Sequence, residues 1–160
     1  MAEWTSVAVQ TVNPGESIVF TENPVRCTRG FIRHRDDSGN FLLSGWTPNN
    51  NRCCCCQNND TATYLVDFGA NIAIPEDGTP GEISVAIALD GGTLFGTTMR
   101  VTPAETEEFF NVSRAVNVGI FKNCCQTLTI RNTSDQPILV QEANVIFARP
   151  DLPNNSGNCR

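Results

Sequence analysis

Four consecutive cysteines at positions 53–56 are the most unusual chemistry in this chain. Adjacent side chains point to opposite sides of an extended backbone, so four neighbouring thiols are poorly placed to surround one tetrahedral metal ion. A disulfide between neighbours is also strained, because Cα atoms about 3.8 Å apart lie below the usual range for a bridge. We therefore expect disulfides to cysteines elsewhere in the chain or in another subunit. The disulfide candidates are Cys27, Cys53, Cys54, Cys55, Cys56, Cys124, Cys125 and Cys159.

Two alternatives to disulfides remain open for these thiols. A metal–thiolate site would use several of them as ligands, and reduced thiols would have no role. At positions 124 and 125, an extended backbone turns one side chain toward the core, where a cysteine can simply be a small buried residue. Cys159 lies in a polar tail that can reach a neighbouring subunit. The even number of cysteines permits complete pairing, but the sequence does not give the connectivity.

Catalytic machinery is not predicted. His34 is the single histidine, and no surrounding motif pairs it with a nucleophile, so we interpret it as a surface residue of a strand. The segment 36–40 and the side chains of Glu105, Glu107 and Glu108 could offer oxygen ligands to calcium. A hairpin turn for the first and a solvated acidic turn for the second are the favoured interpretations, because neither matches a calcium-binding loop pattern. We expect no enzyme activity, no cofactor and no metal site.

Charge and hydropathy exclude two kinds of partner. The net charge is −6, from 17 acidic and 11 basic residues, and such a chain repels a phosphate backbone, so nucleic-acid binding is not expected. No apolar run reaches the about 18 residues that a membrane-spanning helix needs. The remaining partners are a second copy of the chain, a host-surface receptor or a glycan.

Cysteine content and the N-terminus together suggest where the protein works. Eight cysteines normally indicate an oxidising compartment, yet the first residues lack the basic and apolar segments of a secretory signal. Either the thiols stay reduced or metal-bound inside a cell, or a particle leaves the cell by lysis and oxidises afterwards. The second route predicts a virion, a spore surface or an extracellular filament, reached without a signal peptide.

Short alternating segments separated by turn residues dominate the sequence, as in antiparallel sheets. Asp90-Gly91-Gly92 favours a tight hairpin, Gly69 is a candidate bulge, and 102–108 is the one helical candidate because Thr102 can cap it and Pro103 suits its first turn. The expected strands are 5–12, 17–21, 26–35, 41–46, 61–74, 82–89, 93–101, 109–121, 125–131 and 138–147.

These roughly ten strands predict an all-β fold, an antiparallel two-sheet jelly-roll sandwich, because no helices are available for parallel crossovers. We expect a single domain over residues 1–150. Its polar, cysteine-rich loop covers 47–60, and residues 151–160 form a polar C-terminal tail.

Four segments carry a family resemblance: ISVAIALDG at 83–91, FNVSRA at 110–115, CCQTLTIRNTS at 124–134 and QPILVQEANVI at 136–146. They resemble C1q/TNF-like jelly-roll domains of Firmicutes, which occur at the C-terminus of collagen-like spore-surface glycoproteins and in phage structural proteins. The resemblance covers roughly residues 5–148. It implies a non-enzymatic, usually trimeric domain used for trimerisation, display and surface binding. This chain departs from the pattern by lacking a collagen stalk and by carrying the cysteine run.

We therefore expect a structural subunit of a disulfide-stabilised surface assembly that self-associates through its jelly roll. A receptor- or glycan-binding tip module is the first alternative, and a metal–thiolate protein is the second. Large aromatic side chains dominate interfaces, although core packing competes as an explanation for each of them. The interface candidates are Trp4, Trp46, Phe109 and Phe110.

Overall fold

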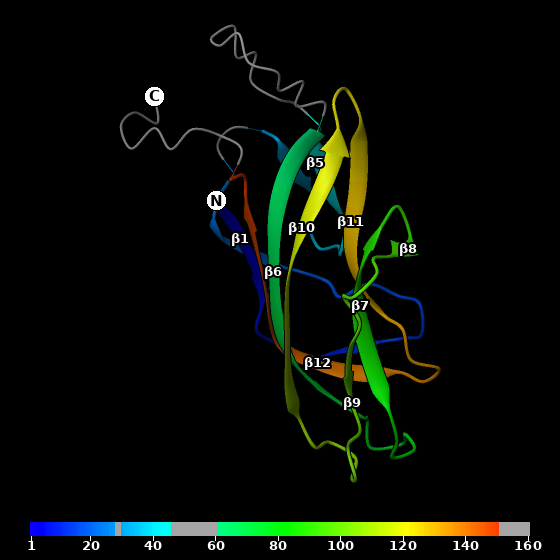
Figure 1. The fold of residues 1–160 in the computed structure, drawn as a ribbon. Helices are drawn as coiled ribbons and strands as arrows, with labels where there is room; N and C mark the ends of the chain where they lie inside the picture. Colours follow the sequence, from blue (N-terminus) through cyan, green and yellow to red (C-terminus); the bar gives the residue numbers. More distant parts are fainter. Residues whose placement is uncertain (28–29, 46–60, 151–160) are drawn as a thin grey trace, which may run out of the picture.

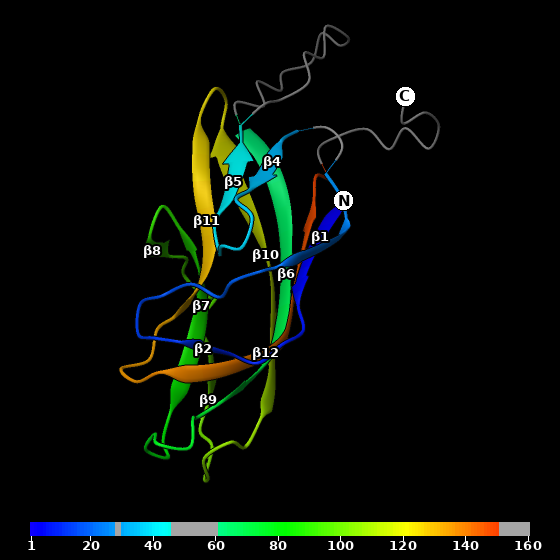
Figure 2. The same cartoon turned by 180° about the vertical axis from the view of Figure 1, so that it is seen from behind.

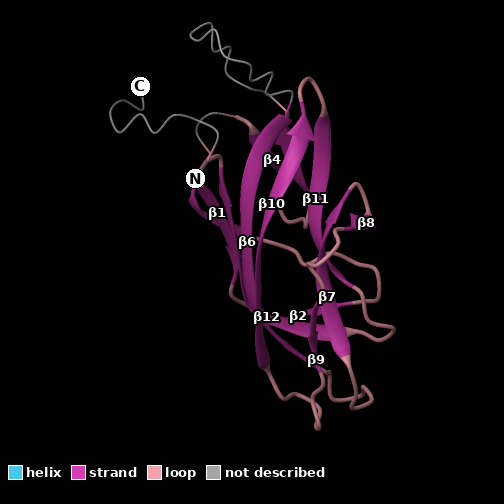
Figure 3. Cartoon of the chain, viewed as in Figure 1, coloured by secondary structure: helices cyan, strands magenta, loops and turns pink. Residues whose placement is uncertain are grey.

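The computed structural model describes residues 1–27, 30–45 and 61–150. Within these ranges the chain forms twelve β-strands and no helix (Figure 3). None of the described segments is therefore a helix that could cross a lipid bilayer. The all-β prediction from alternation is confirmed.

The strands form two antiparallel sheets that face each other across one core (Figure 1). Sheet A contains, in spatial order, β10 (Phe110–Phe121), β6 (Thr61–Ala73), β12 (Ile138–Ala148), β1 (Ala2–Ser6) and β3 (Glu22–Val25), and β2 (Gln10–Val12) also pairs with β12. Sheet B contains β4 (Ile32–His34), β5 (Phe41–Ser44), β11 (Cys125–Asn132), β7 (Ile83–Leu89) and β8 (Gly92–Thr93), and β9 (Met99–Val101) also pairs with β7.

The pair β6–β10 is the longest ladder of sheet A, running without a register shift from Thr61↔Phe121 to Ile72↔Phe110. Along β6 from Thr61 to Ile72, every second residue is buried and the residues between are half-buried or exposed. This is the period of a strand with one face on a core. The alternation seen in the sequence therefore fixes which face of sheet A points outward.

The predicted strand at 5–12 is divided into β1 and β2, which both pair with the long strand β12. Strand β1 pairs with the C-terminal part of β12 and β2 with its N-terminal part. Between them β12 carries an extra residue, where Gln141 and Asn144 face positions only two apart on β6. Glu142 in this bulge has a φ of 51°. The bulge predicted at Gly69 therefore lies on the opposite strand.

The segment expected as a strand at 17–21 instead crosses between the sheets (Figure 2). Its only bridges are the isolated pairs Ser17↔Arg131 and Phe20↔Ser38. The amide side chain of Gln10 bonds both the N–H and the C=O of Val19, at 2.8 and 2.9 Å. A side chain thus takes the place of a neighbouring strand.

Two other local predictions are corrected. Residues 102–108 form no helix: Glu107 has a φ of 59° and its N–H donates to the carbonyl of Ile74, 2.7 Å away. A left-handed residue cannot continue a right-handed helix. Among the described residues of the segment 26–35, which are 26–27 and 30–35, only Ile32–His34 is a strand. The hairpin turn is confirmed, since Asp90 and Gly91 both have positive φ (49° and 83°), as a primed two-residue turn requires.

Aromatic rings fill the core between the sheets near the N-terminus. The Phe41 ring from sheet B lies 5.1 Å from Trp4 and 5.0 Å from Phe147, both of sheet A, and 5.4 Å from Phe20. Offset and edge-on contacts of this kind stabilise by about 0.5–1.5 kcal/mol beyond the area that they bury.

Tyr64 of β6 reaches across the sandwich with a hydroxyl that has no solvent exposure. The oxygen lies 2.6 Å from the carbonyl of Ser44 and 2.9 Å from that of Phe31, and the Arg149 guanidinium lies over the Tyr64 ring, 4.7 Å from its centroid. Burial raises the pKa of Tyr64, and the nearby positive charge of Arg149 opposes that rise. This cluster ties sheet A to the segments around β4 and β5.

Candidate functional site

The described cysteines lie at one end of the sandwich and carry free thiols. Cys124 and Cys125 are exposed at the turn between β10 and β11, whereas Cys27 is half-buried and packs against the core. The expectation that one of the vicinal pair faces the core is therefore wrong. The candidates Cys53, Cys54, Cys55, Cys56 and Cys159 lie outside the described residues.

The chain on either side of residues 46–60 is anchored beside this cysteine pair. The N–H of Gly45 donates to the carbonyl of Cys124 at 2.7 Å, and Thr61 pairs with Phe121. Gly45 is required there, because a Cβ atom would lie 1.8 Å from the carbonyl oxygen of Phe121. Both ends of the cysteine-rich segment thus start within a few residues of Cys124 and Cys125.

The aromatic interface candidates differ in how far their side chains are buried. Trp4 is 3% exposed and belongs to the core, which is the packing alternative. Phe109, just before β10, is 38% exposed, and Phe110, the first residue of β10, is half-buried. Trp46 lies outside the described residues. The most exposed phenylalanines, Phe95 and Phe121, were not among the sequence candidates.

His34 shares a hollow of about 430 Å³ with Cys27, Asp36 and Asp37, the residue types that a thiol nucleophile would use. Its ring is stacked on Phe41, 4.6 Å between centroids, and its Nε2 lies 2.9 Å from the carbonyl of Ser38. In the described ranges it bonds neither the thiol nor a carboxylate, so its ring serves packing and the turn. The expected surface position is only partly right, since the ring is half-buried.

The acidic segments behave as turns where they are described. Ser38 closes the 36–40 turn through its hydroxyl, which donates to the carbonyl of Arg35 at 2.6 Å. Glu108 accepts a hydrogen bond from the N–H of Ala104. Across residues 1–27, 30–45 and 61–150, no three His, Cys, Asp or Glu side chains gather as a metal site.

The outer face of β10, β6 and β12, here called the sheet A face, carries very few charges. Its exposed apolar side chains include Leu65, 38% exposed, and Phe121, 66% exposed. Asp67 on β6 and Glu142 in the bulge are its acidic groups. The outward positions are Asn111, Ser113, Ala115, Asn117, Gly119 and Phe121 on β10, Thr61, Thr63, Leu65, Asp67, Gly69 and Asn71 on β6, and Leu139, Gln141, Asn144, Ile146 and Ala148 on β12.

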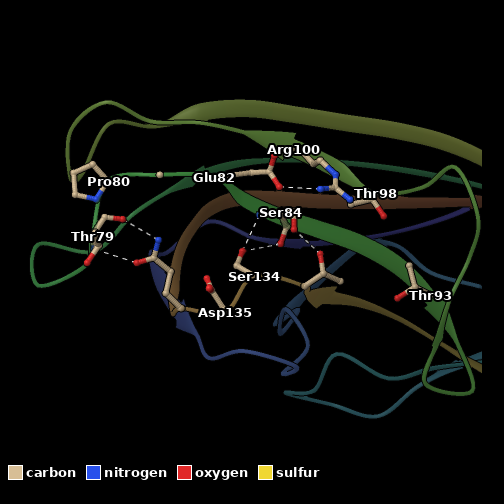
Figure 4. Close-up of a pocket in the computed structure, with 12 residues that line it drawn as sticks. Thr79, Pro80, Glu82, Ser84, Thr93, Thr98, Arg100, Ser134 and Asp135 are labelled. Carbon is tan, nitrogen blue, oxygen red and sulfur yellow. Dashed lines mark hydrogen bonds and ion pairs between the residues drawn. The ribbon is translucent and has the colours of Figure 1, made fainter.

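A polar groove of about 810 Å³ lies over sheet B, beside β7, β9 and the turns that precede β7 and β12 (Figure 4). We call it the hydroxyl groove. A smaller hollow of about 290 Å³ continues it toward Arg131 and shares Thr93, Thr133 and Ser134. The groove is lined by Thr79, Pro80, Gly81, Glu82, Ser84, Thr93, Thr98, Arg100, Thr133, Ser134, Asp135 and Gln136.

Hydrogen bonds hold the floor of the hydroxyl groove. Ser84 is buried, with 7% of the residue exposed, and its hydroxyl lies 2.7 Å from that of Thr133. The N–H of Ser84 donates to the Ser134 hydroxyl at 2.8 Å. The side chain of Gln136 pairs with both backbone groups of Thr79, at 2.9 and 3.1 Å. These contacts join two turns that are far apart in sequence.

Buried Asn132 supports the same turn from below. Its side-chain N–H₂ donates to the carbonyls of Val12 and Gln136, both at 2.9 Å, and its oxygen accepts from the N–H of Ser134 at 2.8 Å. On the wall of the groove, Arg100 forms an ion pair with Glu82 at 2.8 Å. Sequence reasoning missed this site because its residues come from separate segments, and no motif brings them together.

No family model matches the sequence, and no curated protein matches it. Among solved structures the chain is similar to the TNF protein Eiger from S. frugiperda, with a TM-score of 0.59 and 11% identity over 98% of this chain and 96% of that one. It is also similar to the globular domain of zebrafish complement 1qA, with a TM-score of 0.56 and 10% identity over 91% and 94%. The chain has the two-sheet jelly-roll fold of C1q and TNF domains.

Proposed function

We propose that this domain is a structural subunit that self-associates through the sheet A face within a surface assembly. The observation that supports this most is the near absence of charge on that face, in a chain of net charge −6. Two copies can approach there without the like-charge repulsion that other surfaces would create. The sequence resemblance implies a trimer, and closed rings are the usual form of homo-oligomers.

Leu65, Phe121 and Ile146 give this face apolar groups that a partner can bury, and its small residues allow a flat approach. A stable contact needs about 800 Å² from each partner. An extended three-stranded face is the kind of surface that can provide it. The particle that we propose is a virion, a spore surface or an extracellular filament.

Disulfide bonds would then stabilise the assembly covalently. The exposure of Cys124 and Cys125 makes them the described cysteines that are available to a partner thiol, whereas Cys27 is half-buried. Cys56 is five residues from Thr61, a distance that an extended chain covers in at most about 18 Å. Intrachain and interchain pairing are therefore both compatible with the described geometry.

The test of self-association is a charge placed on the sheet A face. Leu65→Lys should weaken association about thirtyfold, roughly 2 kcal/mol, since the ammonium group would be buried against a partner. The matched control is Leu42→Lys on the outer face of sheet B, because Leu42 is 36% exposed and Leu65 38%. Sedimentation velocity over a concentration series measures both.

A wild-type chain that stays monomeric at high concentration contradicts the proposal, as does an assembly that survives Leu65→Lys. Non-reducing electrophoresis tests the disulfides separately. Bands of high mass should collapse with reductant and be lost when Cys124 and Cys125 are both changed to Ser. A monomer band with and without reductant would contradict interchain bonds while leaving non-covalent association intact.

A further inference from the structure

The hydroxyl groove has hydrogen-bonding capacity that the protein itself does not use. Among the described residues, the hydroxyls of Thr93 and Thr98 and the carboxylate of Asp135 make no side-chain hydrogen bond. Arg100 has Glu82 as its described partner, and a guanidinium carries five N–H donors in a fixed fork. The groove thus presents donors and acceptors together, with its floor already held in place.

The lining selects the chemical class of ligand. Its volume lies within the range of about 300–1,000 Å³ that is usual for small-molecule sites, but such sites are mostly apolar. Here Pro80 is the main apolar side chain and hydroxyls dominate. A ligand rich in hydroxyl groups can satisfy this lining, whereas an apolar ligand would leave it unpaired at a cost of about 1–3 kcal/mol for each buried group.

The charge of the lining residues narrows the class of ligand further. Within the groove itself, Glu82 and Asp135 contribute two carboxylates against the one guanidinium of Arg100. The guanidinium of Arg131 lies in the adjoining hollow, where it already donates to the carbonyls of Gly15 and Gly91. An anionic ligand such as a phosphate or a uronic acid would meet net negative charge, so an uncharged ligand fits better. Carboxylates and a guanidinium can each bond two adjacent hydroxyls, which is the arrangement that a sugar ring offers.

Phe95 is an exposed apolar side chain close in sequence to the lining residues. Its side chain is fully exposed, at 103%, on the short connection between the lining residues Thr93 and Thr98. That connection is rigid: Thr97 is 1% exposed, and its hydroxyl lies 2.8 Å from the carbonyl of Leu94 and 3.1 Å from that of Ile87. An exposed aromatic side chain on a held backbone segment between two lining residues is available as an anchor of the kind that dominates binding surfaces.

We propose that the hydroxyl groove binds a neutral oligosaccharide, with Phe95 packing against the apolar C–H face of a sugar ring at the rim. Thr98, Arg100 and Asp135 would bond the hydroxyl groups of the ligand. The groove lies over sheet B, on the opposite side of the sandwich from the sheet A face. Binding is therefore independent of the proposed self-association, and an assembly would present several copies of the groove outward.

The experiment applies the labelled full chain to an array of neutral and acidic oligosaccharides that covers hexose, deoxyhexose, pentose and N-acetylhexosamine units. We expect retention on neutral members, competed by the same free oligosaccharide. Calorimetry with that oligosaccharide should then show an affinity about tenfold weaker for Phe95→Ala, and a comparable loss for Thr98→Val. Phe121→Ala is the matched control, because it removes an exposed phenylalanine from the sheet A face.

No retention of any neutral oligosaccharide would overturn the proposal, as would stronger retention of acidic ones. Binding that is unchanged in both Phe95→Ala and Thr98→Val would place the ligand elsewhere and overturn it as well. Leu65→Lys separates the two proposals: a monomeric variant that keeps its calorimetric affinity shows that the groove acts without assembly. Circular dichroism and thermal unfolding confirm that each variant is folded.

Discussion

Removing the single hydroxyl of Tyr64 tests how the two sheets are held together. Tyr64→Phe keeps the ring beneath the Arg149 guanidinium but deletes the oxygen that lies 2.6 Å from the Ser44 carbonyl and 2.9 Å from that of Phe31. The same oxygen accepts a long hydrogen bond of 3.4 Å from Nη1 of Arg149, which is lost with it. The hydroxyl has one hydrogen and donates to one carbonyl at a time. The Phe31 carbonyl keeps a second donor, the N–H of Ser44 at 2.9 Å.

The loss should therefore correspond to about one buried hydrogen bond with its desolvated partner, roughly 2 kcal/mol within a range of about 1–3 kcal/mol. For a chain of this size that lowers the melting temperature by about 4–8 °C. Urea unfolding and calorimetry of both proteins measure the difference. A variant whose free energy of unfolding matches the wild type within about 0.5 kcal/mol would refute the role assigned to the hydroxyl.

The same residue gives a spectroscopic check, because it is the only tyrosine of the chain. Burial raises the pKa of Tyr64 above the usual value of about 10. The unfolded chain then releases this proton at lower pH than the folded one. The stability that Tyr64 contributes is therefore fully present below about pH 10, and it is lost as the pH rises from there through the folded pKa. Phenolate absorbance should appear above pH 10 in the folded protein and near pH 10 in urea, and equal titrations would contradict the burial argument.

Two further substitutions test the supports of the surfaces. Asn132→Ala should lower the free energy of unfolding by about 2–3 kcal/mol, because the Val12 and Gln136 carbonyls and the Ser134 N–H lose their shared buried partner. It should weaken oligosaccharide binding as well. A free energy of unfolding within about 0.5 kcal/mol of wild type would be inconsistent with that network. Gly45→Ala should cost at least about 2 kcal/mol, since its Cβ would overlap the Phe121 carbonyl, and an unchanged urea midpoint would show that the hairpin can move away.

Much of the fold follows from alternation and turn chemistry. The strands at 61–74 and 109–121 and the Asp90–Gly91 turn were expected, because period-two alternation and adjacent residues with positive φ are local properties. The pairing of those two strands as β6 and β10 was not, because it depends on the topology of the sheet. The segment 102–108 was misread because its helix signals are local too. A tertiary hydrogen bond from Glu107 to Ile74 overrides them.

The sites were harder to predict than the strands. The alternating pattern predicts that Trp4 faces one side of its strand, but it does not predict that Phe41 and Phe147 pack against that side. The hydroxyl groove depends on turns that meet only after folding, with Thr79 held by Gln136. Among the predicted site residues, the structure brings Cys124 and Cys125 to one exposed turn. It brings no other described disulfide candidate into a bond with them.

The position of β12 in the middle of sheet A has a consequence for biosynthesis. This strand lies between β6 and β1, and the ribosome makes it after every other strand of the sheet. Until residue 148 has emerged, the nascent chain holds two halves of a sheet that lack their shared neighbour, with open edges that invite wrong pairing. Sheet A can therefore close only after β12 has joined its two halves, and chaperones that shield strand edges should raise the yield of folded protein.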